Sequence, residues 1–122
     1  MFFNKQTPKN IGDQAESMAE NYLRNKKIKI IERNFRAKTG EIDLIADHQG
    51  TVVFIEVKFR KSTNFGEPFE TVTRSKQRKI IQTSQIYLQK NPKLANKACR
   101  FDVISIHNKD INWIKNAFDT SS

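Results

Sequence analysis

The sequence predicts an α/β domain with two main helices and four to five strands. Apolar residues recur at helical spacing in two segments, residues 10–27 and 68–90. Two runs rich in Ile, Val and Phe, residues 41–46 and 51–60, flank a polar turn and are typical of paired strands. Further strand-like runs, residues 99–106 and 111–118, follow the second helix.

The composition indicates one basic domain. The chain has 122 residues, enough for a single core and too few for two. Lys and Arg number 22 against 13 Asp and Glu, which gives a net charge of +9. This excess favours a polyanionic partner, most commonly nucleic acid, although a soluble basic protein without such a partner shares the composition. The single Cys99 excludes an internal disulfide, and its apolar surroundings predict that it is buried.

Targeting signals are not evident in the sequence. No apolar run approaches membrane-spanning length, and Met1-Phe2-Phe3 is too short for the apolar part of a secretory signal. We therefore expect a cytoplasmic protein that does not act at a membrane. Residues 1–9 and 119–122 flank the patterned region, so the single domain, 1–122, is predicted to have flexible ends.

The first helix is amphipathic, with Asn10 available as its N-cap. Glu16 borders the apolar stripe, where a glutamate is usually a solvated edge residue. If the helix packs over the polar face of the later hairpin, however, Glu16 points toward Asp43 and Glu56. A first strand follows at residues 28–33, and residues 34–40 are predicted to be a basic connector that ends at Gly40.

The hairpin concentrates charge on one face. If Ala46 opposes Thr51 across a four-residue turn, Glu41 faces Glu56 and Asp43 lies diagonally from it. Side chains in a strand alternate between two faces. The charged residues that then share one face are Glu41, Asp43, Glu56 and Lys58. The residues predicted on the opposite, core face are Ile42, Leu44, Ala46, Val53, Ile55, Val57 and Phe59.

Two interpretations of the charged face remain open. It is a solvated face, as in many antiparallel hairpins, or it is a site that binds a cation. Apolar Ile45 and Phe54 lie on the same face and indicate that part of it is covered. Like charges opposite one another destabilise a sheet and favour a bound cation. A one-residue bulge would move Asp43 to the other face.

The second helix carries a basic run near its start. Its cations are Arg74, Lys76, Arg78 and Lys79. Positive charges there oppose the helix dipole, which favours a phosphate-contacting role over a purely structural one. The residues predicted to contact a nucleic-acid backbone are Arg36, Lys38, Arg60, Lys76 and Arg78.

The order of Glu16, Asp43 and the Glu56-Val57-Lys58 triplet resembles the PD-(D/E)xK nuclease superfamily. Within it, the chain is similar to the YraN-type family of bacterial proteins, which resembles archaeal Holliday-junction resolvases. The most specific part of this resemblance is the block from Gly40 to Ala46, followed at the right distance by Glu56-Val57-Lys58. Ile42 stands where the superfamily's name has proline.

The resemblance implies a restriction-endonuclease-like core with a mixed central sheet. It also implies a metal-dependent endonuclease that hydrolyses DNA, including branched or structured DNA, as a homodimer with Mg²⁺ or Mn²⁺. Asp43, Glu56 and the carbonyl of Val57 would be metal ligands, and Glu16 an accessory ligand or a residue that positions water. Lys58 would orient or activate the attacking water and stabilise charge on the phosphate. The alternatives are a non-catalytic nucleic-acid-binding accessory protein and, more weakly, a module that binds an acidic protein.

Overall fold

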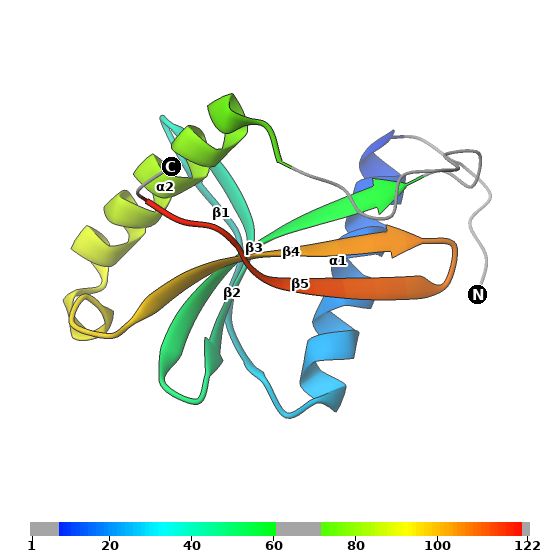
Figure 1. Ribbon diagram of the computed structural model, residues 1–122, viewed down its shortest axis with the longest axis horizontal. Coiled ribbons are helices and arrows are strands. Elements are labelled where there is room, and N and C mark those ends of the chain that lie inside the picture. Colours follow the sequence, from blue (N-terminus) through cyan, green and yellow to red (C-terminus); the bar gives the residue numbers. More distant parts are fainter. Residues whose placement is uncertain (1–7, 61–71, 121–122) are drawn as a thin grey trace.

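The computed structural model describes residues 8–60 and 72–120. The elements, in chain order, are α1 (Pro8–Asn25), β1 (Lys29–Ala37), β2 (Gly40–His48), β3 (Thr51–Arg60), α2 (Arg74–Lys90), the 3₁₀ helix η1 (Pro92–Leu94), β4 (Cys99–His107) and β5 (Asp110–Phe118). The strands form one sheet in the order β1-β2-β3-β4-β5 (Figure 1). Only the β3–β4 pair is parallel. The predicted α/β fold, with a mixed sheet and two helices, is confirmed.

Two apolar clusters hold the helices against the sheet. The α1-side cluster consists of Ala15, Ala19, Leu23, Ile28, Leu44, Ala46, Val53, Ile55, Ile104 and Ile106. The α2-side cluster consists of Phe35, Ile42, Ile45, Val52, Phe54, Val72, Ile80, Tyr87, Phe101, Val103 and Phe118. Each helix therefore buries its apolar stripe against its own set of strand residues. Neither helix, within the described ranges, has the length and apolar character needed to cross a membrane.

The first elements are longer than the sequence predicts. Helix α1 begins at Pro8, before the predicted N-cap, and β1 continues to Ala37. Arg36 consequently lies on a strand and not in a connector. Cys99, predicted to be buried, is exposed because the buried part of β4 begins only at Phe101. Residues 1–7 and 121–122 of the predicted flexible ends lie outside the described residues.

Helix α2 begins later than predicted. Val72 and Thr73 precede the helix, and the Oγ1 of Thr73 accepts a hydrogen bond from the backbone N–H of Lys76 at 3.2 Å. A threonine in this position satisfies one of the free N–H groups of the first turn, which explains why the helix starts there. The remainder of the predicted N-terminal extension, residues 68–71, lies outside the described residues.

The β2–β3 hairpin turns through two residues and not four. Gln49 and Gly50 have φ of 55° and 92°, as a tight hairpin turn requires. Ala46 therefore opposes Val53, and the predicted pairing with Thr51 is wrong by two positions. Because the shift is even, the side chains near the turn keep their predicted faces.

The carboxylate of Asp102 is the most completely buried charged group in the described chain, with 0% exposure. Arg100 donates to it from Nε at 2.9 Å and from Nη2 at 3.0 Å. Trp113 Nε1 donates at 2.8 Å, and the backbone N–H of Asn116 donates at 2.9 Å. The contact lies where the β4–β5 register shifts, so Asp102 joins the two strands at an irregularity in their ladder.

We expect the Asp102→Ala variant to lose about 3–5 kcal/mol of unfolding free energy, because Arg100 would keep a charge without its partner. Urea denaturation followed by the fluorescence of Trp113 measures this loss. Asp110→Ala, at the exposed start of β5, is the control and should change stability by less than about 0.5 kcal/mol. Equal effects of the two substitutions would contradict the assignment.

Candidate metal centre and adjoining basic pocket

Strands β2 and β3 stop pairing with each other before their far ends. Their ladder ends at Leu44 opposite Ile55, whereas β3 continues to pair with β4 as far as Arg60. Beyond the ladder, the backbone N–H of Val57 donates to Oδ2 of Asp43 at 2.8 Å. A side-chain carboxylate thus replaces the backbone acceptor that a continued ladder would supply.

Asn34 disturbs the alternation of β1 in the same region. Its φ is +58°, in the left-handed region that asparagine tolerates. Arg33 lies near Glu16 of α1, with Nε 3.6 Å from Oε1, while Phe35 packs with Ile42 in the α2-side cluster. The prediction that Ile42 shares the core face of Leu44 is therefore wrong. Phe59, also predicted on that face, is 45% exposed.

Three carboxylates converge at this irregularity and are called here the acidic cluster: Glu16 from α1, with Glu41 and Asp43 from β2. One oxygen of each lies within 4.8 Å of the others. The sequence predicted that Glu16 would reach Asp43 if α1 packed over the polar face of the hairpin. Helix α1 instead packs on the apolar face, and the two groups meet beyond the end of the ladder. Glu41 was not among the predicted ligands, although its spacing of two from Asp43 was the available signal.

Glu56 lies beside the acidic cluster. Its side chain is 8% exposed, and its Oε2 lies 3.5 Å from Nζ of Lys76 on α2. Burial raises the pKa of Glu56, while the charges of Lys76 and Lys58 lower it. Because the N–H and C=O of one strand residue point to the same side, the carbonyl of Val57 points to the side of β3 on which Asp43 lies.

The pKa values of two cluster residues are strongly perturbed. Burial, followed by the negative charge of Glu56, raises the pKa of Asp43 to about 7, although the N–H of Val57 opposes the shift. Burial, followed by the charge of Asp43, raises the pKa of Glu16 to about 7, although Asn34 and Arg33 oppose that shift. The ionised cluster is therefore unfavourable unless a cation accompanies it.

The ligands of the acidic cluster fit a hard divalent ion. All are carboxylate oxygens, which Mg²⁺ and Mn²⁺ prefer. Oε1 of Glu16 is buried and accepts no hydrogen bond, so it keeps a lone pair for a ligand. Asp43 brings a second oxygen besides the one that accepts from Val57.

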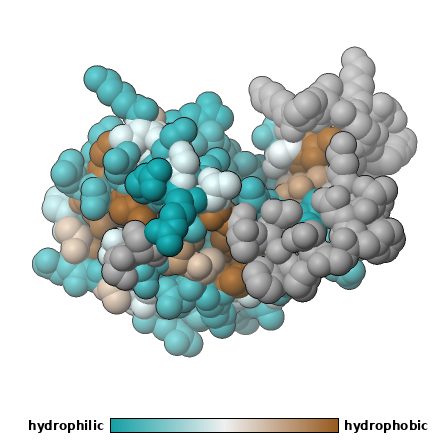
Figure 2. All heavy atoms as spheres, turned by 45° about the horizontal axis from the view of Figure 1, so that its top comes forward, coloured by the Kyte–Doolittle hydropathy of each residue, from teal (hydrophilic) through white to brown (hydrophobic). Residues whose placement is uncertain are grey.

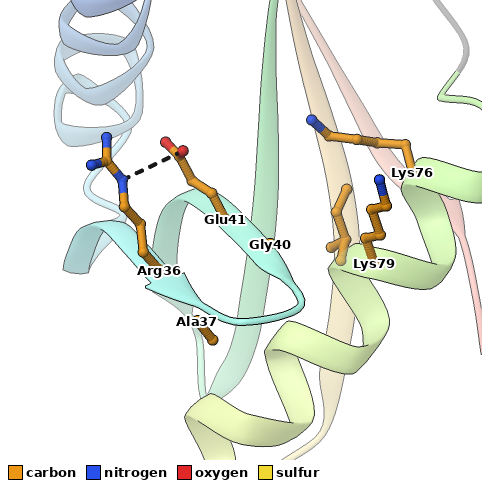
Figure 3. Close-up of a pocket in the computed structure, with 7 residues that line it drawn as sticks. Arg36, Ala37, Gly40, Glu41, Lys76 and Lys79 are labelled. Atoms are coloured by element: carbon orange, nitrogen blue, oxygen red, sulfur yellow. Dashed lines mark ion pairs between the residues drawn. The ribbon is translucent and has the colours of Figure 1, made fainter.

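A pocket of about 390 Å³ adjoins the acidic cluster (Figure 3). Its lining residues are Arg36, Ala37, Gly40, Glu41, Lys76, Lys79 and Ile80. Glu41 belongs both to this pocket and to the cluster, and Lys76 connects the pocket to Glu56. We call it the basic pocket, since its lining contains three cations and one carboxylate.

The predicted nucleic-acid-binding residues are distributed unevenly around this pocket. Arg36 and Lys76 line it. Lys38 is exposed in the β1–β2 turn, and Arg78 lies two residues from Lys76 and so faces another side of α2. Arg60 is 7% exposed at the end of β3. Hydrophilic side chains cover much of the described part of the face in Figure 2, with smaller hydrophobic areas between them.

Comparison with known proteins places the chain in a family. Residues 15–106 match the family described as "Uncharacterised protein family UPF0102". The chain belongs to the UPF0102 family. A UPF0102 protein of Saccharophagus degradans is 50% identical over 107 residues, covering 88% of this chain and 91% of that protein. A relative from Persephonella marina is 50% identical over 108 residues, covering 88% and 92%. The UPF0102 match includes the acidic cluster and the basic pocket.

The raised pKa values predict how stability depends on pH without metal. The folded state holds protons on Asp43 and Glu16 up to about pH 7, whereas unfolded carboxyl groups release them near pH 4. Stability from these groups is therefore present at low pH and is lost as the pH rises from about 4 to 7. We expect the melting temperature in EDTA to fall by roughly 4 °C or more between pH 5 and 8.

The Asp43→Asn variant tests the origin of this dependence. It removes the charge while leaving an oxygen for the N–H of Val57, so its melting temperature should fall less over the same pH range. Asp110→Asn, at the exposed start of β5, should keep the wild-type dependence. Parallel curves for all three proteins would show that the acidic cluster does not cause the change.

Proposed function

We propose that this UPF0102 protein is a metal-dependent endonuclease that hydrolyses DNA phosphodiester bonds, with branched or structured DNA as the candidate substrate. One observation carries the proposal: carboxylates from α1 and β2 converge within 4.8 Å of one another, beside the Glu56–Lys58 segment of β3. The resemblance to the PD-(D/E)xK nucleases supports the same assignment, since Asp43, Glu56 and Lys58 match its motif.

Asp43 and Glu16 would hold the metal, with Glu41 in reach on the same strand as Asp43. Glu56 and the carbonyl of Val57 complete the predicted ligand set. Mg²⁺ or Mn²⁺, once bound, would activate water and offset the charge of the phosphate. The raised pKa values of the cluster favour this proposal, because a group buried against like charge in a metal-free protein gains most from a cation.

Lys58 would orient the attacking water and stabilise negative charge on the phosphate. It follows Glu56 by two residues on β3, so the two side chains leave the strand on the same face. Its charge acts on Glu56, but it forms no ion pair with a carboxylate of residues 8–60 or 72–120. The ammonium group is consequently available to a substrate oxygen.

DNA suits the charge distribution better than an uncharged substrate does. The net charge of +9 and the basic pocket would attract a phosphate backbone, and binding should weaken as salt is added. The similarity to junction resolvases adds a homodimer to the proposal, in which two copies would act on two strands.

A non-catalytic accessory protein that binds nucleic acid is the second candidate. The observation in its favour is the ion pair between Glu56 and Lys76, which occupies a predicted metal ligand with a cation of the protein itself. This candidate predicts salt-sensitive DNA binding without metal-dependent cleavage at any Mg²⁺ or Mn²⁺ concentration. The nuclease proposal predicts both salt-sensitive DNA binding and metal-dependent cleavage.

Asp43→Asn should abolish metal binding and cleavage together. We expect calorimetric titration with Mn²⁺ to show binding to the wild type alone, and nicking of branched DNA to fall at least roughly 100-fold in the variant, because even outer partners of metal ligands contribute 10–100-fold. DNA binding in EDTA should persist. Asp110→Asn is the matched control. Cleavage by Asp43→Asn at the wild-type rate would refute the proposed role of Asp43.

Lys58→Gln should separate metal binding from chemistry. Because Lys58 is assigned to the water and phosphate and not to the metal, Mn²⁺ affinity should change little while the cleavage rate falls by about 10²–10⁴-fold. Lys109→Gln is the control, because it also removes one positive charge, in the exposed β4–β5 turn, and it should leave the cleavage rate unchanged. Equal losses of rate in both variants would indicate a general charge effect.

A further inference from the structure

We infer that the basic pocket is a separate, metal-independent site for a phosphodiester of the nucleic-acid backbone, next to the one that is cut. The inference rests on the proposed function and deepens it by locating where the strand is held. The pocket lies between the end of the β1–β2 hairpin and the first turns of α2. It shares Glu41 with the acidic cluster, so a phosphate held here would flank the bond presented to that cluster.

The cations that line the pocket come from two elements. Lys76 and Lys79 are three residues apart and therefore project from the same side of α2. Arg36 comes from β1 on the opposite wall, and Figure 3 shows its side chain beside Glu41. A phosphate oxygen between these walls can be approached by cations from both sides.

Existing ion pairs leave this positive charge available. Nε of Arg36 lies 3.5 Å from Glu41, and Nζ of Lys76 lies 3.5 Å from Glu56. The side chain of Arg36 is 73% exposed, so its pair with Glu41 is weak. Lys76, 47% exposed, pairs with the buried carboxylate of Glu56, and it can add its charge to the pocket while that pair is kept. Lys79 is exposed and forms no ion pair with any carboxylate of the described chain. Arg36 and Lys79 can therefore contact an incoming phosphate without the loss of a strong interaction.

The two walls of the pocket are fixed to each other. The hydroxyls of Thr39 and Thr83 lie 2.6 Å apart, which joins the β1–β2 turn to α2, and Thr83 also donates to the carbonyl of Lys79 at 2.7 Å. Gly40 has φ of +147°, a conformation that other residues rarely adopt, and it lies next to Thr83 and Lys79 of α2. A preformed site of this kind avoids the cost of ordering two elements on binding.

The dimensions suit one phosphate with its sugar. The volume of about 390 Å³ is near the lower end of the range for small-ligand pockets, about 300–1,000 Å³. The apolar part of the lining, Ala37 and Ile80, offers a surface for the sugar carbons. The site would consequently bind the backbone of a single strand without contacting its bases.

Amide NMR spectra with a dinucleotide test this inference in EDTA, where cleavage plays no part. Titration with thymidylyl-3′,5′-thymidine, which has one phosphodiester, should give saturable shifts at Gly40 and Lys79. Lys79→Gln should weaken this affinity at least about threefold. Lys93→Gln, an exposed lysine of η1 beyond the far end of α2, is the charge-matched control and should bind as the wild type does.

The other outcomes overturn the proposal. Shifts reproduced by sodium chloride or glutamate at the same ionic strength would show that the pocket responds to charge alone. An affinity of Lys79→Gln equal to that of the wild type would place the dinucleotide elsewhere. Failure of the nuclease proposal has a different signature, because a protein that never cuts DNA would still show the dinucleotide shifts if the pocket is a phosphodiester site.

Discussion

The hydrogen bond between the Asp43 carboxylate and the N–H of Val57 is the interaction on which the arrangement of the site depends. If β2 and β3 paired along their full length, that N–H would bond to a backbone carbonyl, and the carboxylates would be spread along one face of a regular sheet. Glu16, on the helix that covers the other face, would then lie behind the strands. Because the ladder ends at Leu44, the acidic groups of a helix and a strand instead meet at one point.

Two aspartates of the described chain, Asp102 and Asp43, lie in contrasting environments. Asp102 is fully buried, yet Arg100, Trp113 and a backbone N–H satisfy its oxygens. Its role is complete within the fold. Asp43 has one such backbone donor and faces other carboxylates, and burial, followed by the charge of Glu56, raises its pKa to about 7. The same chemical group is stabilised in one place and left short of positive charge in the other. The metal ion of the proposed function would supply the positive charge that Asp43 lacks within the fold.

Much of the fold could be predicted from sequence because its signals are local. Helical spacing identified both helices, and β-branched runs identified the strands. The side chains near the β2–β3 turn were assigned to the right faces although the predicted register was wrong, because an error of two positions preserves side-chain direction. The details of the site depend on features without a strong local signal. The left-handed backbone at Asn34, the end of the β2–β3 ladder and the packing of Ile42 beside Phe35 all follow from contacts between distant segments. The sequence placed Glu41 on the charged face and Lys79 in the basic run, but it assigned neither to the metal ligands or to the backbone contacts.

The division of charge between the two sides of β2 suggests an order of events for the proposed nuclease. Glu16 on α1 adds negative charge to the cluster, while Lys76 and Lys79 on α2 add positive charge to the pocket. A DNA backbone would be attracted to the pocket whether or not metal is present, but an ionised acidic cluster would repel it. A strand held in the pocket would therefore reach the cluster favourably only after a cation has offset those carboxylates. Binding of the DNA backbone and binding of the metal are then separate requirements. The cations of the basic pocket would meet the first and the carboxylates of the acidic cluster the second, and Glu41 belongs to both.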